Sequence, residues 1–255
     1  MRTRGFWAML KNRKCRHEVY ASPEYWNSRA EEFPGESMSM FINNHLNHVY
    51  RSEQLSVIQK YLPDVKGLDI LDVGCGGGRI ARHMVARGAH VYGVDFSKKS
   101  IEIAMQKSRD GNPSYRVQSI YDLNEQNAYH IVLAWGVFTV ACHDRSDLFN
   151  AMKRLRAALR PGGRLLVCDP IHKGPYHRVL DMDVKEYTNV MEDAGFAIKD
   201  VTQIHFLPMR LLLSYIPWPK FITLCGYYID RAIMKIMRHK KFGDYKVIYA
   251  VLRSQ

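Results

Sequence analysis

The chain has 255 residues, and its 37 Lys and Arg residues exceed its 25 Asp and Glu residues by 12, so it is strongly basic. A hydrophobic content of 47% and a charged content of 24% are those of a globular protein and exclude a disordered or low-complexity chain. No apolar run approaches the roughly 18 residues that cross a bilayer, and the five cysteines follow no zinc or disulfide spacing. We therefore expect a reduced, cytoplasmic protein.

The beginning of the chain combines basic and aromatic residues. Residues 1–20 contain six Lys or Arg residues and one acidic residue. Helical spacing of apolar residues at about 23–62 predicts a helical leader. Aromatic residues gather in this region at Tyr20, Tyr25, Trp26 and Phe33.

From residue 68 to 170, short apolar runs alternate with segments of helical spacing. The predicted strands are 68–74, 90–95, 114–119, 130–136 and 164–169, and the predicted helices are 79–88, 98–108 and 145–159. A turn is expected at Arg160–Gly163. This alternation is typical of a doubly wound, mostly parallel α/β sheet with right-handed crossovers. A helix at 183–194 and strands at 196–206 and 245–253 complete the pattern.

The junction after the first predicted strand is rich in glycine. Asp72-Val73-Gly74-Cys75-Gly76-Gly77-Gly78 would let backbone N–H groups approach a ligand at the start of the next helix. Asp95 ends the second predicted strand, where an acid binds ribose hydroxyls in such folds. A dinucleotide motif from Gly74 fails at Arg79, whereas a frame shifted to Gly76 passes. The glycines alone therefore leave the nucleotide open, but the presence of one mononucleotide-binding half favours a ligand other than a dinucleotide.

Five motifs in order resemble those of the class I S-adenosylmethionine-dependent methyltransferases, over about residues 60–170. They are LDVGCGGGRIA (71–81), VYGVDFSKKSIEIA (91–104), RVQSIYDL (116–123), HIVLAWGVF (130–138) and LRPGGRLLV (159–167). The resemblance implies a seven-stranded sheet with an antiparallel last strand. It is greatest to the small-molecule group that includes ubiquinone-biosynthesis O-methyltransferases.

The resemblance also implies a set of cofactor-binding residues. Gly74, Gly76 and Gly78 would contact the methionine part of S-adenosylmethionine, supported by Asp72, and Asp95 would bind the ribose. Ser119 and Ile120 would flank the adenine, and Ala134, Trp135 and Gly136 would lie beneath the sulfonium. Cys75 and Phe96 are the two further implied cofactor-binding residues.

Three positions depart from the family pattern: Ser119 stands where an acid is frequent, and Thr139-Val140 replaces a frequent Glu-His pair. In the family a leader such as residues 18–33 often folds over the cofactor. The aromatic residues here either form such a lid or only pack a leader helix on the sheet.

Methyl transfer to a hydroxyl needs a base, and histidine is the usual one. His143 follows the fourth predicted strand, and His172 and His177 follow the fifth, all at the carboxyl edge where ligands bind in open α/β sheets. These three are the predicted catalytic residues. No acidic spacing suggests a metal, so we expect metal independence.

Residues 205–243 form an apolar, basic excursion before the last strand, divided by Pro217-Trp218-Pro219. Its second half is predicted to be an amphipathic helix with one apolar face, made by Ile222, Cys225, Gly226, Ile229, Ile233, Ile236 and Met237. Three roles are open for this face: it covers the active site, it contacts a membrane surface together with the basic N-terminus, or it binds a partner. A nucleic acid is not the expected partner, because aromatic residues do not alternate with the basic residues as a stacking surface for bases requires.

These features predict four regions: 1–62 as basic tail and leader or lid, 63–204 as the cofactor-binding core, 205–243 as the insertion and 244–255 as the last strand. The predicted function is S-adenosylmethionine-dependent methylation of a small acceptor, at an oxygen of an apolar, quinol-, phenol- or lipid-like molecule. The alternatives are a cofactor-binding partner protein without catalysis, a dinucleotide-dependent oxidoreductase, and an RNA methyltransferase suggested by charge alone.

Overall fold

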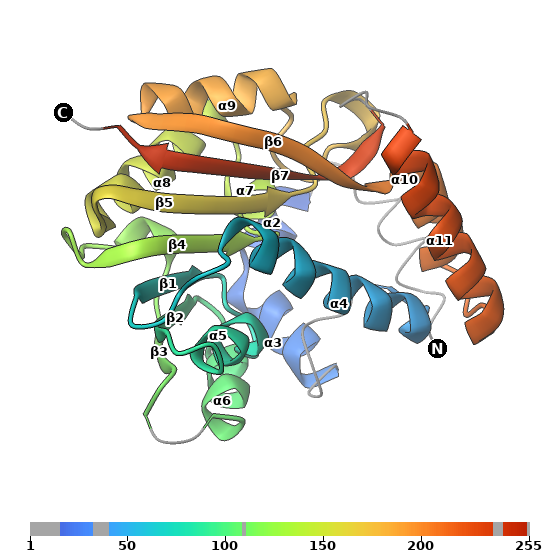
Figure 1. Ribbon diagram of the computed structural model, residues 1–255, viewed down its shortest axis with the longest axis horizontal. Coiled ribbons are helices and arrows are strands. Elements are labelled where there is room, and N and C mark those ends of the chain that lie inside the picture. Colours follow the sequence, from blue (N-terminus) through green and yellow to red (C-terminus); the bar gives the residue numbers. More distant parts are fainter. Residues whose placement is uncertain (1–15, 33–40, 109–110, 237–241, 254–255) are drawn as a thin grey trace.

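The computed structural model describes residues 16–32, 41–108, 111–236 and 242–253. Its centre is a seven-stranded sheet with the strand order β3-β2-β1-β4-β5-β7-β6 (Figure 1). The strands are β1 (Asp69–Val73), β2 (His90–Asp95), β3 (Ser114–Val117), β4 (Tyr129–Trp135), β5 (Leu159–Asp169), β6 (Phe196–Phe206) and β7 (Gly243–Leu252). The first five strands pair in parallel, and β7 runs antiparallel to both β5 and β6. The predicted fold class is confirmed.

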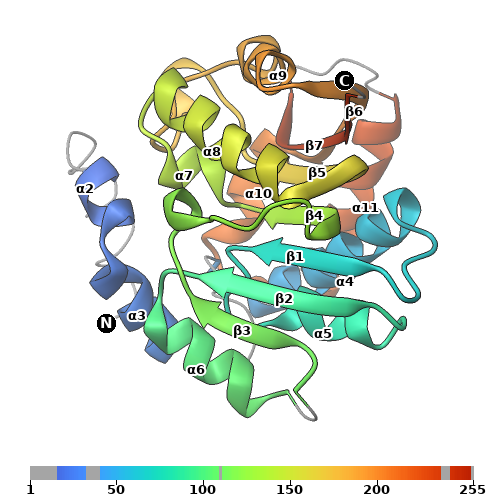
Figure 2. The ribbon, with the colours of Figure 1, turned by 90° about the vertical axis from the view of Figure 1, so that its left-hand side faces the viewer.

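Helices cover both faces of the sheet, because its central strands are apolar on both sides. On one face, α8 (Arg145–Ala158) and α9 (Val184–Asp193) bury residues such as Leu148 and Tyr187. On the other face, α4 (Asn44–Tyr61) and α5 (Arg79–Val85) bury Ile58 and Met84 (Figure 2). The α6 helix (Lys98–Gln106) lies beside β3. The sheet therefore has a hydrophobic core on each of its two faces.

The predicted turn at Arg160–Gly163 is instead part of β5. Leu159 pairs with Tyr129, the register then shifts, and regular pairing with β4 resumes at Arg164. Gly162 has a φ of +71°, which provides the bend. The guanidinium of Arg160 donates a 2.8 Å hydrogen bond to Asp69 on β1, so the irregular segment is held on the sheet. A register shift of this kind bends a strand while the strand stays paired with its neighbour. The turn residues Arg160–Gly163 alone do not distinguish such a bend from a loop that leaves the sheet.

The leader forms three helices, α2 (Arg16–Ala21), α3 (Pro23–Glu32) and α4. Tyr20, Tyr25 and Trp26 form one aromatic cluster, with ring centroids 5.2 to 5.9 Å apart. Asn27 on α3 accepts hydrogen bonds from the Ser97 hydroxyl (2.8 Å) and the Lys99 N–H (3.1 Å), so it ties the leader to the beginning of α6. Phe33 and residues 1–15 lie outside the described residues.

The excursion before the last strand forms α10 (Leu207–Ser214) and α11 (Lys220–Ile236), separated near Pro217-Trp218-Pro219 as predicted. The predicted apolar face of α11 does not point uniformly inward. Gly226 is buried and Ile233 is half-buried, but Ile222, Cys225, Ile229 and Ile236 are exposed. Met237 lies outside the described residues.

Candidate functional site

A cavity of about 440 Å³ lies along the carboxyl edge of the parallel strands. It extends from Asp95 at the end of β2, past the glycine loop after β1 and Trp135 at the end of β4, to Tyr245 on β7 and His205 on β6. The strand order reverses between β1 and β4, and open α/β sheets bind ligands at that position. The volume falls in the range of small-molecule sites.

The glycine loop adopts a conformation that side chains disfavour. Gly74, Gly76 and Gly78 have φ values of +65°, +52° and +72°. A Cβ at Gly74 would lie 2.6 Å from Val137 Cγ2, and one at Gly78 would lie 2.2 Å from the Tyr115 hydroxyl oxygen. The loop is therefore compact, and its backbone at Gly74 and Gly76 borders the cavity directly.

Asp95 fixes the loop from the neighbouring strand. Its carboxylate accepts a 2.9 Å hydrogen bond from the Gly76 N–H and a 2.8 Å bond from the Ser97 N–H. Burial raises the pKa of Asp95 to about 6, although these two bonds lower it. A carboxylate has further lone pairs, so Asp95 can also accept hydroxyl donors from a ligand in the cavity.

Asp72 lies under the same loop and is almost fully buried. Burial, and next the charge of Asp95, raise the pKa of Asp72 to about 7. One oxygen of its carboxylate is buried and has no hydrogen-bond partner. Two acids in one buried position are costly unless a cation or donors approach them, which is consistent with a cationic or hydroxyl-bearing ligand nearby.

Cationic side chains border the glycine-loop end of the cavity. Arg79 begins α5 and Arg51 lies on α4, and both line the cavity. Arg79 donates a 3.3 Å hydrogen bond to the Arg51 carbonyl oxygen, and its buried Nε has no partner. Burial, followed by the charge of Arg51, lowers the pKa of Arg79 to about 10, so it is still protonated at pH 7. This end of the cavity suits an anionic group such as a carboxylate.

The apolar side chains of Phe96 and Ile120 also line the cavity. Ser119 lines it too, and the Ser119 hydroxyl accepts a 3.3 Å bond from the Tyr121 N–H at the start of η2 (Ile120–Asp122). Ser119 therefore uses its side chain to cap this short helix. The Asp95 carboxylate and these apolar walls fit an adenosine, and the Arg79 end fits an amino-acid carboxylate.

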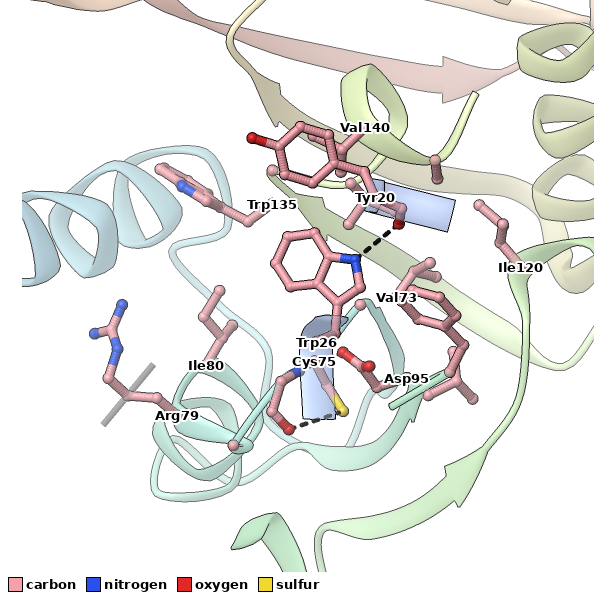
Figure 3. A pocket seen from close by; sticks show the side chains of 18 of the residues that line it. Tyr20, Trp26, Val73, Cys75, Arg79, Ile80, Asp95, Ile120, Trp135 and Val140 are labelled. Carbon is pink, nitrogen blue, oxygen red and sulfur yellow. Dashed lines mark hydrogen bonds between the residues drawn. The ribbon is translucent and has the colours of Figure 1, made fainter. Parts of the chain in front are cut away.

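Residues of the leader line the cavity as well. Tyr20, Ala21 and Trp26 are among the lining residues. In Figure 3 the Trp26 indole lies between Trp135 and Asp95, and its Nε1 donates a 2.8 Å hydrogen bond to the Tyr20 carbonyl oxygen. An electron-rich ring at this position can contact a sulfonium through its face.

Nine of the twelve predicted cofactor-binding residues line the cavity. The other three, Asp72, Gly78 and Ala134, are buried next to lining residues and not at the cavity surface. Asp72 and Gly78 belong to the same loop, and Ala134 precedes Trp135 on β4. The cofactor assignments remain predictions from the sequence, and the geometry agrees with most of them.

The three predicted catalytic histidines do not line this cavity. His143 is exposed, and its ring lies 4.3 Å from that of His17 on α2. His172 binds Asp244 at 2.8 Å, and His177 contacts the Gly174 carbonyl oxygen within its own turn. Each ring thus contacts a group other than the cavity lining.

A fourth histidine, which sequence reasoning missed, does line the cavity. His205 is 5% exposed at the end of β6, with a φ of +64°, and its ring stacks on Tyr50 with centroids 3.6 Å apart. Its Nδ1 lies 3.5 Å from a carboxylate oxygen of Glu53 on α4. Burial lowers the pKa of His205 to about 3, so the ring is neutral at pH 7. The carboxyl-edge rule would have found it, had it been applied to β6, which runs parallel to β5.

Comparison with known proteins agrees with this site. Residues 70–163 match the methyltransferase domain family. Together with the sheet order and the glycine loop, this match supports the predicted class I S-adenosylmethionine-dependent methyltransferase, with S-adenosylmethionine as the cofactor.

Among curated proteins, the chain is similar to ubiquinone biosynthesis O-methyltransferases. The protein of Coxiella burnetii (strain Dugway 5J108-111) is 25% identical over 186 residues, which cover 64% of this chain and 77% of the relative. The protein of Xylella fastidiosa is 33% identical over 123 residues, which cover 47% of this chain and 48% of the relative.

Solved structures share the fold. A magnesium protoporphyrin IX methyltransferase from Synechocystis PCC 6803 with bound S-adenosylhomocysteine has a TM-score of 0.62 at 17% identity, covering 93% of this chain and 97% of that one. An S-adenosylmethionine-dependent methyltransferase from Mesorhizobium loti has a TM-score of 0.58 at 19% identity, covering 78% of this chain and 97% of that one.

Proposed function

We propose that this methyltransferase acts on the hydroxyl oxygen of a small apolar acceptor, which binds at the β6–β7 end of the cavity. The observation that carries the proposal is His205, a buried neutral imidazole in the wall of the cavity that also contains the cofactor residues. The curated relatives are named O-methyltransferases, which supports oxygen as the methylated atom.

The walls around His205 favour an apolar, planar acceptor. Phe41, Tyr50 and Tyr245 line this end of the cavity, and Tyr245 makes an edge contact with His205 at 5.8 Å. Aromatic walls with few polar groups bind flat apolar molecules and orient them through those few groups. A phenol or quinol satisfies both requirements.

Bound S-adenosylmethionine supplies a methyl group already activated by the sulfonium, so the protein must mainly align the acceptor and exclude water. Formation of the C–O bond releases the hydroxyl proton. A neutral His205 can accept a hydrogen bond from the acceptor's O–H through one ring nitrogen and take up this proton as the C–O bond forms. Because burial holds the pKa of His205 at about 3, the ring would pass the proton on through Nδ1 to Glu53, whose own pKa is raised by burial. The Glu53 carboxyl group at Nδ1 would orient the ring and stabilise the protonated form, as a carboxylate does for a catalytic histidine.

The test is product formation, measured by mass spectrometry with a panel of phenols and quinols. His205→Ala and His205→Gln should lower kcat by about 100-fold or more, the usual contribution of a general base, while calorimetric binding of S-adenosylmethionine is unchanged. His177→Ala is the matched control and should keep full activity. Glu53→Gln should lower kcat and shift its pH profile with little change in KM. Unchanged turnover in both His205 variants would refute the role of this histidine.

A further inference from the structure

The α11 helix is oriented with its polar face inward. The residues that it buries against the body are Thr223, Gly226, Tyr227 and Asp230, which recur at the spacing of one helical face. Exposed apolar residues occupy much of the remaining surface: Phe221 is 76% exposed, Tyr228 63%, Ile229 52% and Ile236 79%. Soluble helices normally show the reverse arrangement.

Hydrogen bonds fix α11 in this orientation. The Asp230 carboxylate accepts a 2.6 Å bond from the Phe206 N–H, and the Thr223 hydroxyl accepts a 2.9 Å bond from the Asn43 side chain. Gly226 lies directly against Leu213 of α10, with room for no larger side chain unless Leu213 moves. Rotation of the helix to hide its apolar face would break these buried bonds, so the exposed face is a stable feature.

The apolar surface continues onto the neighbouring segment. Leu212 on α10 is 53% exposed and Ile216 is 42% exposed. We call the surface formed by Leu212, Ile216, Phe221, Ile222, Tyr228, Ile229 and Ile236 the outer face of α10–α11. An exposed apolar face of this kind marks an interaction site.

The charges around the outer face select the partner. Lys220, Arg231 and Lys235 are exposed, and the only acid of α10–α11, Asp230, is buried. The surface is therefore apolar and cationic with no exposed carboxylate on these two helices. We infer that the outer face of α10–α11 docks on the surface of a bilayer that contains anionic phospholipid, with its apolar side chains among the acyl chains and its cations at the phosphates.

A second copy of the chain fits this face less well. Joining two copies through it would place Arg231 and Lys235 opposite like charges, with no carboxylate on the same helices to compensate. None of the helices in the described residues is long and apolar enough to cross a membrane.

The outer face is close to the acceptor end of the cavity. Tyr227, on the inner side of α11, packs in one cluster with Tyr50, and Tyr50 lines the cavity beside His205. Docking through α11 would therefore bring this end of the cavity near the lipid. The docking itself does not depend on the proposed acceptor chemistry, so either proposal can fail alone.

The experiment is flotation of the full chain with vesicles of phosphatidylcholine alone or with 30% phosphatidylglycerol. The wild type should float with the anionic vesicles, less so in high salt, and little with phosphatidylcholine alone. Arg231→Gln/Lys235→Gln should bind the anionic vesicles about thirtyfold more weakly. The matched control Lys185→Gln/Lys199→Gln removes two exposed cations outside α10–α11 and should change binding far less.

A second variant, Phe221→Gln/Ile229→Gln/Ile236→Gln, should abolish flotation. Because these side chains are exposed, its thermal unfolding and its binding of S-adenosylmethionine should match those of the wild type. Three results would each overturn the inference: absence of wild-type flotation with anionic vesicles, flotation of the triple variant at the wild-type level, or a wild-type dimer in light scattering that the triple variant dissociates without any vesicle binding.

Discussion

Replacement of Gly74 by Ala tests whether the glycine loop is shaped by backbone conformation and close contact together. Gly74 has a φ of +65°, and its new Cβ would lie 2.6 Å from Val137 Cγ2. Gly67 has a similar φ of +71°, but a Cβ there meets nothing within 4 Å. Both substitutions therefore place a side chain at positive φ, but only Gly74→Ala also creates a steric overlap.

The expected magnitudes follow from this difference. An alanine at positive φ costs about 1–2 kcal/mol in the free energy of unfolding. Overlap with a packed neighbour adds about 1–3 kcal/mol. Gly67→Ala should thus lose about 1–2 kcal/mol, and Gly74→Ala about 2–5 kcal/mol.

The assay is urea unfolding followed by circular dichroism, with the two-state assumption checked by a second probe. Val137→Ala should relieve the overlap but not the backbone strain, so the pair Gly74 and Val137 should show a coupling of about 1–3 kcal/mol in a double-mutant cycle. Gly74→Ala should also lose affinity for S-adenosylmethionine, whereas Gly67→Ala should not. Equal destabilisation of the two glycine variants, with no coupling to Val137, would refute the reasoning.

Three further outcomes are expected. Because the pKa of Asp95 is about 6, the affinity for S-adenosylmethionine should fall as the pH drops from 7 to 5, and calorimetry with Asp95→Asn should show weaker binding without this dependence. The native pKa of Asp72 is raised from 3.8 to about 7, so the protonated carboxyl stabilises the fold below pH 3.8 and this stabilisation is lost as the pH rises through 7. At pH 8 the free energy of unfolding in urea should therefore be larger for Asp72→Asn than for the wild type, by on the order of 4 kcal/mol, and the difference should be smaller at pH 5. Removal of the bonds that Asn27 accepts should release the leader, so Asn27→Ala should be cut faster by trypsin within α3, with wild-type protection restored in Asn27→Asp.

The sequence by itself determined the fold and the cofactor end of the site. The alternation of short apolar runs with helical spacing, and the glycines between Asp72 and Arg79, are local patterns whose meaning does not depend on distant residues. The strand ends that they predicted lie along one edge in the structure, since parallel strands place all their carboxyl ends together. Most of the predicted cofactor residues consequently line one cavity.

The proposed acceptor end of the cavity was decided only by tertiary structure. His205 enters the cavity because β6 lies beside β7 and because α4 places Tyr50 and Glu53 against the ring, and these contacts join residues far apart in the sequence. The position of His143 after a strand was a correct local observation, yet the course of the following loop decides where such a side chain points. No short-range pattern contains that information.

The direction of α11 was likewise left open by its sequence. Helical periodicity determines which residues share a face, and it correctly grouped Ile222, Ile229 and Ile236. It does not determine which face turns inward, because that depends on partners supplied by other segments. Here the Phe206 N–H and the Asn43 side chain bind Asp230 and Thr223, and these buried hydrogen bonds turn the polar face toward the protein and the apolar face outward.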